Sequence, residues 1–411
     1  MRHSWLLLAA CLAWTGADPE FHARREALAK ALPDGVVVLY GQVEREDADL
    51  RGGFFQDSNF FYLTGWKSPG AALLIDPRRE ILFLPKHNAA RERWTGRQPA
   101  QDDADIQEAA GFQTVLPPEA LEGELRASLE RYPKVYAAGP DAMARIKALA
   151  LPGEAVSAES AIARLRMKKS AHEIELLQHA ADASIAAHLA AWKRAAPGIY
   201  EYQIAATIQF TYLDLGCERN AYAPIVGSGP DSVYLHYSRN SRRMERGDLM
   251  LVDAAGECAG YAADITRTIP VGAKFSARQR EIYQIVLGAQ KAVIAAVKPG
   301  AYIGGPGRVS LQKIARDYID SHGKDLHGEG LGEYFTHGIS HHIGLDVHDA
   351  ADNNVPLEEG IVISVEPGIY IPEENIGIRI EDMVLVTKDG ARVMTAALPR
   401  EAAEIEKAIR N

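Results

Sequence analysis

The fold of the second half of this chain is decided by residues 249–268, which read LMLVDAAGECAGYAADITRT. Two strand-like runs flank a turn bounded by glycines. If Gly256 pairs with Tyr261, then Asp253 lies directly opposite Asp264, with the two β-carbons about 5 Å apart. Two carboxylates this close repel each other unless a proton or a cation lies between them. The alternative is an aspartate that only caps the turn. The apolar neighbours disfavour it, because an ionised carboxylate in a buried strand needs a partner.

A second acidic hairpin is predicted near the C-terminus. Residues 362–368 and 376–384 are β-rich runs, and the polar loop that joins them can set Glu366 beside Glu381. A single glutamate in an apolar strand is equally well explained as an edge charge. Two acidic pairs in one domain instead indicate a shared cation site.

A histidine cluster completes this set. Four of the chain's 13 histidines lie within the twelve positions from His337 to His348. Beside two acidic hairpins, such a cluster is better explained by metal ligation and substrate contacts than by packing. The pattern leaves open whether His341 or His342 is the ligand. Four carboxylates and one imidazole suit Mn²⁺ or another hard divalent ion better than structural zinc. Two such ions, about 3.5–4 Å apart, would form a hydrolytic centre.

The elements around these motifs predict an α+β domain. Helical spacing of apolar residues predicts helices over 160–195, 200–215, 277–297 and 308–322, and a strand-rich tail follows over 335–393.

The first half is predicted to be a separate α/β domain with a mixed sheet. Strand-like runs alternate with helical stretches from residue 20 to about 151, and this alternation is typical of that class. The change of pattern near residue 160 divides the chain into domains 18–160 and 161–411. The expected strands are 35–40, 71–75 and 80–84, and the expected helices are 21–32 and 118–132.

Composition excludes several classes of protein. Of 411 residues, 47% are hydrophobic and 24% charged, which is typical of a globular protein of about two domains and not of a disordered chain. The net charge of −10 argues against nucleic acid as a partner, because phosphate binding needs a basic face. Only three cysteines are present, and we expect Cys217 and Cys258 to be unpaired small hydrophobes.

Residues 1–17 are predicted to be a Sec signal peptide, so we expect a periplasmic or secreted protein. A basic start precedes an apolar run from Trp5 to Trp14, and small residues follow up to Ala17. The run is too short to cross a bilayer, which takes about 20 residues, and we expect no membrane span elsewhere. The alternatives are a frayed helix and a lipoprotein anchored through Cys11.

The ordered set Asp253, Asp264, His341, Glu366 and Glu381 resembles the dinuclear site of the pita-bread metallopeptidases, which include methionine aminopeptidase, prolidase and Xaa-Pro aminopeptidase. The first half is similar to the amino-terminal domain of Xaa-Pro aminopeptidases and prolidases, which methionine aminopeptidases lack. The motifs that carry the resemblance are FQDSNFFYLTG (55–65), WTGR (94–97), IVGSG (225–229), LHY (235–237), ADITRT (263–268), HGISH (337–341), GLDVHD (344–349), VEPGIY (365–370) and GIRIED (377–382).

The resemblance implies a role for each ligand. It selects His341 over its neighbour. Asp264 and Glu381 would bridge two cations, Asp253 would chelate one of them, and His341 and Glu366 would complete the other. A bridging water, acidified by the cations, would attack the scissile carbonyl, with Glu366 as general base.

The resemblance also implies the residues that contact the substrate. His236 and His348 would orient the peptide and stabilise the oxyanion, and His337 would line the side of the leaving residue. Arg379 would serve the substrate site as the partner of a carboxylate ligand rather than through direct contact. Trp94 occupies a motif that reaches toward a partner subunit's site in some relatives; a core indole is the alternative.

The implied activity is that of a Mn²⁺-dependent Xaa-Pro aminopeptidase, which removes an N-terminal residue that precedes proline and assembles as a homodimer or homotetramer. Such a bond needs a dedicated enzyme because the proline amide has no N–H and its ring fixes φ. The nearest alternative is a prolidase, restricted to dipeptides. A non-catalytic peptide-binding relative and a metal-free, creatinase-like reaction are both disfavoured by the five ligand positions.

Overall fold

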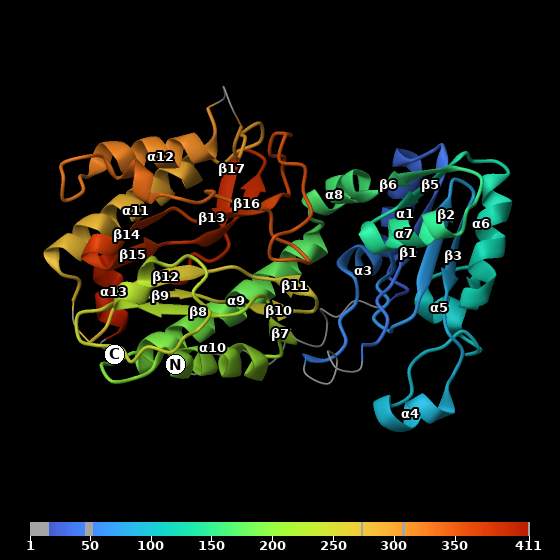
Figure 1. Ribbon diagram of the computed structural model, residues 1–411, viewed down its shortest axis with the longest axis horizontal. Coiled ribbons are helices and arrows are strands. Elements are labelled where there is room, and N and C mark those ends of the chain that lie inside the picture. The colour runs from blue at the N-terminus through green and yellow to red at the C-terminus, as the bar shows by residue number, and fades with distance from the viewer. Residues whose placement is uncertain (1–15, 46–51, 273, 306–308, 410–411) are drawn as a thin grey trace. The chain divides into compact units, whose positions relative to one another are not determined.

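The computed structural model describes residues 16–45, 52–272, 274–305 and 309–409. The chain divides into two compact units, one within residues 13–166 and one within 167–411 (Figure 1). The division falls at the end of helix α8 (Glu159–Met167), whereas the sequence placed the boundary near the start of this helix. Residues 1–15 of the predicted signal peptide lie outside the described residues.

The N-terminal unit is built on one sheet of six strands. Strand β1 pairs antiparallel with β2 and parallel with β5, so the sheet is mixed and the α/β prediction is confirmed. Apolar side chains of the sheet, such as Val36, Leu74 and Phe83, pack against Leu125 and Ile146 of two helices. In spatial order the strands are β4 (Val115–Leu116), β3 (Arg79–Phe83), β2 (Ala72–Asp76), β1 (Gly35–Tyr40), β5 (Lys134–Ala137) and β6 (Glu154–Ser157).

The helices of this unit follow the predicted alternation with strands. They are α1 (Pro19–Ala31), α3 (Ser58–Thr64), α4 (Ala89–Thr95), α5 (Ile106–Ala110), η1 (Pro118–Ala120), α6 (Leu121–Leu129) and α7 (Pro140–Ala148).

In the C-terminal unit, small antiparallel sheets lie between two pairs of helices, which confirms the α+β prediction. Helices α9 and α10 cover one side of the strands, and α11 and α12 cover the other (Figure 1). The sheets have the orders β12-β9-β8, β11-β10-β7, β13-β16-β17 and β14-β15. The strands are β7 (Arg219–Asn220), β8 (Ile225–Ser228), β9 (Leu249–Asp253), β10 (Gly256–Cys258), β11 (Tyr261–Ala262), β12 (Thr266–Pro270), β13 (Val362–Val365), β14 (Gly368–Ile371), β15 (Ile376–Arg379), β16 (Asp382–Thr387) and β17 (Gly390–Val393). The helices are α9 (Ala171–Arg194), α10 (Glu201–Asp214), η2 (Gly229–Val233), α11 (Ala277–Ala296), α12 (Leu311–His322), η3 (Leu331–Tyr334), η4 (Pro372–Glu374) and α13 (Ala402–Ala408).

Two element predictions need correction. The single helical region over 160–195 is two helices, because Ser170 and Glu173 form a capping box that starts α9 anew. The strand-rich tail, predicted to begin at residue 335, begins at β13. Residues 335–361 form no strand and only two isolated bridges, between His342 and Ile363 and between Ile361 and Lys168. No helix within the described ranges is long and apolar enough to cross a membrane.

The turn of the first acidic hairpin is tighter than predicted. Cys258 pairs with Tyr261 around two residues of positive φ, 52° and 84°. The register that follows puts Asp253 opposite Thr266, so the expected pairing of Asp253 with Asp264 is wrong. The error is a shift of two residues. Because strand side chains alternate with a period of two, the shift leaves Asp264 on the face that carries Asp253.

The second acidic hairpin has the expected register. β13 pairs with β16 and β14 with β15 in one continuous alignment, which places Glu366 opposite Glu381 between the two ladders. Pro367 follows Glu366, and because proline has no N–H to donate, the ladder is interrupted there.

Cys217 and Cys258 form a disulfide, which corrects the prediction of two unpaired thiols. The two cysteines lie 41 residues apart in sequence, and only the antiparallel pairing of β7 with β10 brings them together. No local sequence signal announces that pairing, since β7 is two residues long.

A buried ion pair joins β12 to β16 and predicts a large loss of stability when it is broken. Arg267 donates to Asp382 at 2.6 Å, and neither side chain has exposed surface. We expect Arg267→Met to lower the free energy of unfolding by about 3–5 kcal/mol, because the carboxylate of Asp382 stays buried without its main partner. Urea unfolding measures this loss. The control is Arg126→Met, which breaks the half-exposed pair with Glu122 and should cost less than about 1 kcal/mol. Equal losses in the two variants would contradict the prediction.

Candidate metal centre

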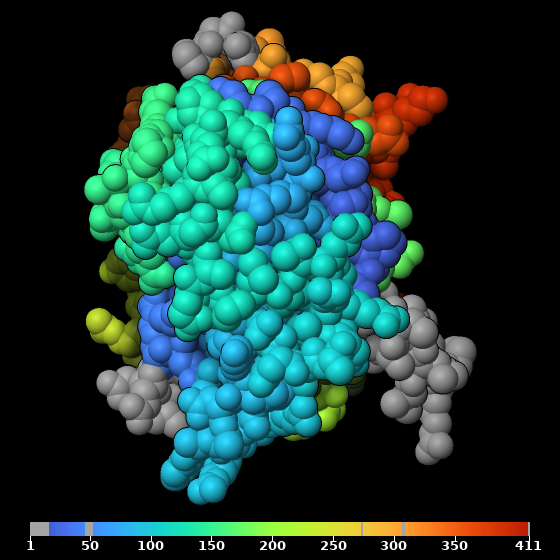
Figure 2. All heavy atoms as spheres, turned by 90° about the vertical axis from the view of Figure 1, so that its right-hand side faces the viewer, coloured from blue at the N-terminus to red at the C-terminus, as the bar shows by residue number. Residues whose placement is uncertain are grey.

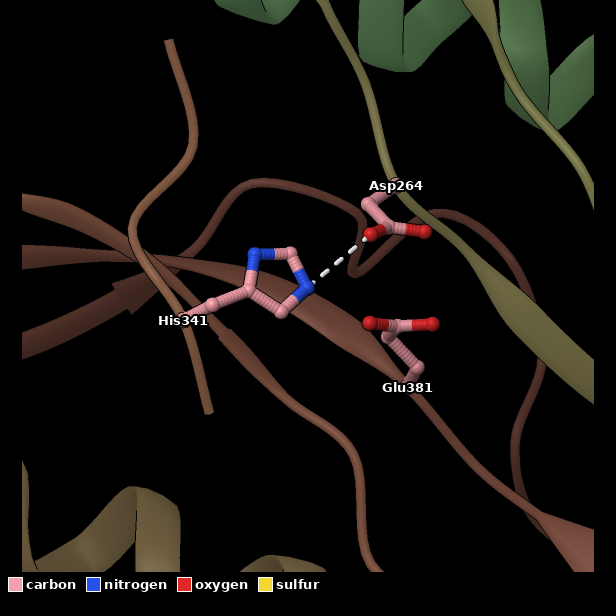
Figure 3. Close-up of side chains that lie close together, drawn as sticks. All are labelled: Asp264, His341 and Glu381. Carbon is pink, nitrogen blue, oxygen red and sulfur yellow. Dashed lines mark ion pairs between the residues drawn. The ribbon is translucent and has the colours of Figure 1, made fainter. Parts of the chain in front are cut away.

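Three predicted ligands converge on one point of the C-terminal unit. Asp264, His341 and Glu381 offer ligand atoms that all lie within 4.8 Å of one another. Figure 3 shows the three side chains facing a common space from separate segments. His341 Nε2 lies 3.2 Å from Asp264 Oδ2 and 3.5 Å from Oε1 of Glu366, which brings a fourth predicted ligand to the same place.

Asp253 joins the group through a tyrosine. The Tyr222 hydroxyl lies 2.5 Å from Asp253 Oδ1 and 2.6 Å from Asp264 Oδ1. The other oxygen of Asp253 accepts a hydrogen bond from Arg379 at 2.6 Å. The structure therefore brings together all five residues that the resemblance implied as ligands.

Strand alternation separates the two neighbouring histidines. Ser364 N–H donates to the carbonyl of His341 at 2.9 Å, and Ile343 N–H donates to that of Val362 at 3.0 Å, so residues 339–343 run antiparallel beside β13. Successive side chains of an extended segment point to opposite sides. His341 faces the carboxylates, whereas His342 is buried away from them.

The hydrogen bonds of His341 favour one nitrogen as a ligand. Its Nδ1 lies 3.1 Å from the carbonyl of His342, an acceptor, so Nδ1 carries the proton. Nε2 is then the nitrogen left for a cation, and it faces Asp264. A ring nitrogen held in this way by a backbone carbonyl is typical of histidines that ligate metals.

Arg379 lies beneath the carboxylates. Its guanidinium is buried and donates to Asp253, to Thr266 Oγ1 at 3.1 Å and to the hydroxyl of Tyr370 at 2.8 Å. Thr266 in turn donates to Glu381 Oε2 at 2.7 Å. These contacts leave Arg379 as a partner of ligand carboxylates, without a surface for direct contact with substrate.

The electrostatics of the group call for positive charge. Burial raises the pKa of Glu366 to about 7, although His341 and Arg379 counteract it. Burial and neighbouring charges also raise the pKa of Asp253 and that of Glu381. Burial would lower the pKa of His341, but Asp264 outweighs it and raises the value to about 9. Without nearby positive charge, these carboxylates tend to stay protonated. Divalent cations would take the place of those protons and let the carboxylates ionise, so the group fits a metal site.

Three further histidines border the centre. The ring of His348 lies 4.1 Å from that of His341, centroid to centroid. Burial lowers the pKa of His337 to about 4, and the charges of Arg379 and His236 add to this. His236 also acts on the pKa of His348, which burial lowers. His236 therefore lies close to both, and His337 and His348 are neutral near pH 7.

Trp94 is not a core residue. It belongs to α4 of the N-terminal unit and is 90% exposed, so the alternative of a buried indole is wrong. The segment that holds α4 projects from the lower edge of the blue and green surface in Figure 2. Trp94 thus belongs to the unit that carries none of the ligands.

The sequence did not predict that three hydroxyl groups lie at the centre. Tyr222, Thr266 and Tyr370 contact ligands or their partners, and Tyr370 also lies 2.8 Å from His337 Nε2. Thr266 and Tyr370 fall within motifs quoted above, but nothing in the sequence marks their hydroxyls. Tyr222 lies in a short link before β8 that carries no pattern.

The metal-free protein is expected to lose stability as the pH rises from about 4.5 to 7. Glu366 has an ordinary pKa of 4.5 and a folded value of about 7, so its favourable contribution is complete below 4.5 and is lost as the pH passes through 7. The loss from this group is on the order of 3 kcal/mol. His341, with a folded pKa of about 9, loses its contribution at higher pH. Urea unfolding of chelator-treated protein at pH 5 and 7.5 measures the change. Glu366→Gln should show a clearly smaller pH dependence, and identical dependence in both proteins would refute the assignment.

Comparison with known proteins agrees with this geometry. Residues 175–388 match metallopeptidase family M24, and residues 21–136 match the N-terminal domain of aminopeptidase P. The chain is 36% identical over 419 residues to a Xaa-Pro aminopeptidase from Haemophilus influenzae, which covers 94% of this chain and 96% of that protein.

Two further matches bear on substrate length. The solved structure of aminopeptidase P from Escherichia coli with the inhibitor Pro-Leu superposes with a TM-score of 0.84 at 30% identity, over 95% of this chain and 98% of that chain. A Xaa-Pro dipeptidase from Pyrococcus furiosus is 38% identical over 241 residues, which cover 58% of this chain and 65% of that protein. The dipeptidase match is thus confined to a smaller part of the chain.

Proposed function

This chain belongs to metallopeptidase family M24, and we propose that it is a metal-dependent Xaa-Pro aminopeptidase, which hydrolyses the bond between an N-terminal residue and a following proline. The observation that carries the proposal is the convergence of Asp264, His341 and Glu381 on one point, with Asp253 and Glu366 beside them. The near full-length match to Xaa-Pro aminopeptidase supports the substrate class. A non-catalytic relative would have no use for a complete ligand set.

Two divalent cations held by these five residues would acidify a water molecule and polarise the scissile carbonyl. The chain's own groups supply the rest of the chemistry. Glu366, whose Oε1 lies 3.5 Å from Nε2 of His341 within the cluster, accepts the proton of the attacking water and passes it to the proline nitrogen as the bond breaks.

The bordering histidines bind the peptide through hydrogen bonds, and burial lowers the pKa of His337 and that of His348, so these two do so as neutral rings. Nδ1 of His337 lies 2.8 Å from the carbonyl of Gly338 and carries the proton, so Nε2 accepts from Tyr370 and the ring is fixed. A fixed, neutral ring suits the wall of a site for the proline side of the bond. His348 and His236 are exposed and near the ligands, which suits them to orient the peptide and to donate to the oxyanion.

The experiment that tests the proposal compares a Xaa-Pro dipeptide with the tripeptide Xaa-Pro-Yaa, using the metal-loaded protein. We expect release of the N-terminal residue from the tripeptide, at a rate at least equal to that from the dipeptide. A protein that cleaves only the dipeptide would be a prolidase. A protein that cleaves neither, although it binds metal, would contradict both assignments.

We propose Mn²⁺ as the metal, because the donor set is four carboxylates and one imidazole and oxygen ligands suit hard cations. Metal-stripped protein titrated with Mn²⁺, Zn²⁺, Co²⁺ and Mg²⁺ tests this. The highest kcat/KM is expected with Mn²⁺, and higher activity with Zn²⁺ would contradict the choice.

We propose that the protein is exported. The apolar run before Ala17 supports this, as does the disulfide between Cys217 and Cys258, since disulfides persist in oxidising compartments. Fractionation of expressing cells and N-terminal sequencing test the proposal. We expect a mature N-terminus at Asp18 outside the cytoplasm; an unprocessed cytoplasmic protein would refute it.

We also propose a homodimer or homotetramer. The highly exposed Trp94 supports this, because it belongs to the WTGR motif, which reaches toward a partner subunit's site in some relatives. Light scattering of the purified protein should give two or four chains, and Trp94→Ala should shift the mass toward one chain. A monomeric wild-type protein would contradict the proposal.

A further inference from the structure

Tyr222 stands between two carboxylates that the proposed function needs as metal ligands. Its hydroxyl lies within hydrogen-bond distance of Oδ1 of both Asp253 and Asp264, at 2.5 and 2.6 Å. A phenol has one proton, so it donates to one carboxylate at a time while its oxygen remains close to both.

From this position, the hydroxyl can orient both carboxylates at once. Asp253 is the last residue of β9 and Asp264 precedes β12, and the observed register does not make them direct partners. A contact between the two carboxylates therefore depends on a third group. A hydrogen bond to Oδ1 of one carboxylate, with the phenol oxygen held close to Oδ1 of the other, restricts the orientation of both side chains. Partners of ligands tune metal affinity in this way.

The segment that carries Tyr222 is held by a narrow attachment. β7 pairs with β10 over two residues only, and hydrogen bonds from Glu218 N–H to Glu257 and from Ala221 N–H to Ala255 extend the contact by one residue each way. So short a strand pair is marginal on its own. Side-chain contacts add to it, such as that of Arg219 with Glu257 at 2.8 Å, and a covalent link would restrict the segment further.

The disulfide supplies that covalent link. Cys217 lies just before β7 and Cys258 ends β10, so the bond closes the ladder at the end away from Tyr222. Cys217 also packs tightly, since a β-carbon on Gly256 would lie only 3.1 Å from its sulfur. The covalent link, the two-residue ladder and the phenol form one continuous connection from α10 to the carboxylates.

We propose that Tyr222 is a positioning residue that holds Asp253 and Asp264 in the arrangement that binds cations, and that the Cys217–Cys258 disulfide fixes the segment that carries it. The inference rests on the proposed function, because it concerns the same ligands. Beyond that function, the inference states that the disulfide affects the affinity of the site for metal ions.

A double-mutant cycle tests the proposal, and the measured quantity is the affinity for metal. Metal-stripped protein is titrated with Mn²⁺, and free Mn²⁺ is followed by electron paramagnetic resonance. We expect Tyr222→Phe to weaken binding by about 10–100-fold. Replacing both cysteines, Cys217→Ser with Cys258→Ser, should weaken it by at least about 5-fold. In the Tyr222→Phe background the cysteine substitutions should add little, because both act through the same hydroxyl.

The matched control is Tyr283→Phe, which removes a buried hydroxyl that donates to the carbonyl of Arg400 at 2.8 Å, outside the ligand cluster. Its Mn²⁺ affinity should equal that of the wild type. Saturating Mn²⁺ should restore most of the activity of Tyr222→Phe, which a loss of fold would not allow. Unchanged affinity in Tyr222→Phe would overturn the role of Tyr222, and fully additive effects would overturn that of the disulfide. A wild-type protein that binds no metal would instead contradict the proposed function.

Discussion

Glu366→Gln is expected to lower kcat/KM on a Xaa-Pro-Yaa peptide by about 10³-fold or more. General-base catalysis alone contributes about 10²–10⁴-fold. The neutral amide of glutamine cannot accept the proton, and it lacks the negative charge with which the carboxylate would bind a cation. Glutamine keeps the shape of the side chain and can still accept the hydrogen bond from Ser364 Oγ, which lies 3.3 Å from Oε1 of Glu366. The metal-free variant should therefore fold and should be no less stable than the wild type at pH 7.5.

The matched control for this loss is Glu373→Gln, on the exposed turn between β14 and β15. It removes the same charge from the same hairpin without touching the centre, and its activity should equal that of the wild type. Steady-state kinetics at saturating Mn²⁺ make the comparison. If Glu366→Gln retained a tenth of the wild-type kcat/KM, Glu366 would not be the general base.

Asp264→Asn should remove metal binding as well as activity. Asp264 contacts His341 and Tyr222 and shares the convergence point with Glu381, so its loss affects three other members of the cluster. We expect the affinity for Mn²⁺ to fall by at least about 100-fold, the upper end of what the loss of an outer partner costs. Activity should then be undetectable at Mn²⁺ concentrations that saturate the wild type.

Metal content after dialysis, together with the titration described for Tyr222, measures this effect. Asp389→Asn, on the exposed turn between β16 and β17, is the control for loss of one aspartate charge and should bind like the wild type. Two tightly bound ions in Asp264→Asn would show that this carboxylate is not a ligand.

Much of the fold followed from periodicity and composition. The alternation of apolar runs and helical stretches predicted the mixed sheet of the N-terminal unit, and the acidic hairpins predicted which carboxylates would meet. Glu366 and Glu381 were aligned correctly because the polar loop between their strands leaves little freedom of register. The choice between His341 and His342 came from resemblance, and strand alternation beside β13 supplies its physical reason.

The errors share a cause, which is dependence on distant parts of the chain. The predicted pairing of Gly256 with Tyr261 implies a turn of four residues, whereas Ala259 adopts a positive φ of 52° and the structure uses a two-residue turn. The disulfide depends on pairing between β7 and β10, and the role of Tyr222 depends on where a short link crosses the ends of two strands. Neither leaves a local pattern, so the sequence could not reveal them.

The most direct test of the account is the rate at which metal-stripped protein releases the N-terminal residue from a Xaa-Pro-Yaa peptide, before and after Mn²⁺ is restored, with Xaa-Ala-Yaa as the matched peptide. The account predicts no measurable release without metal, recovery that is complete near two Mn²⁺ per chain, and strong preference for the proline peptide. Release that is unaffected by removal of the metal, or equal rates on the two peptides, would contradict it.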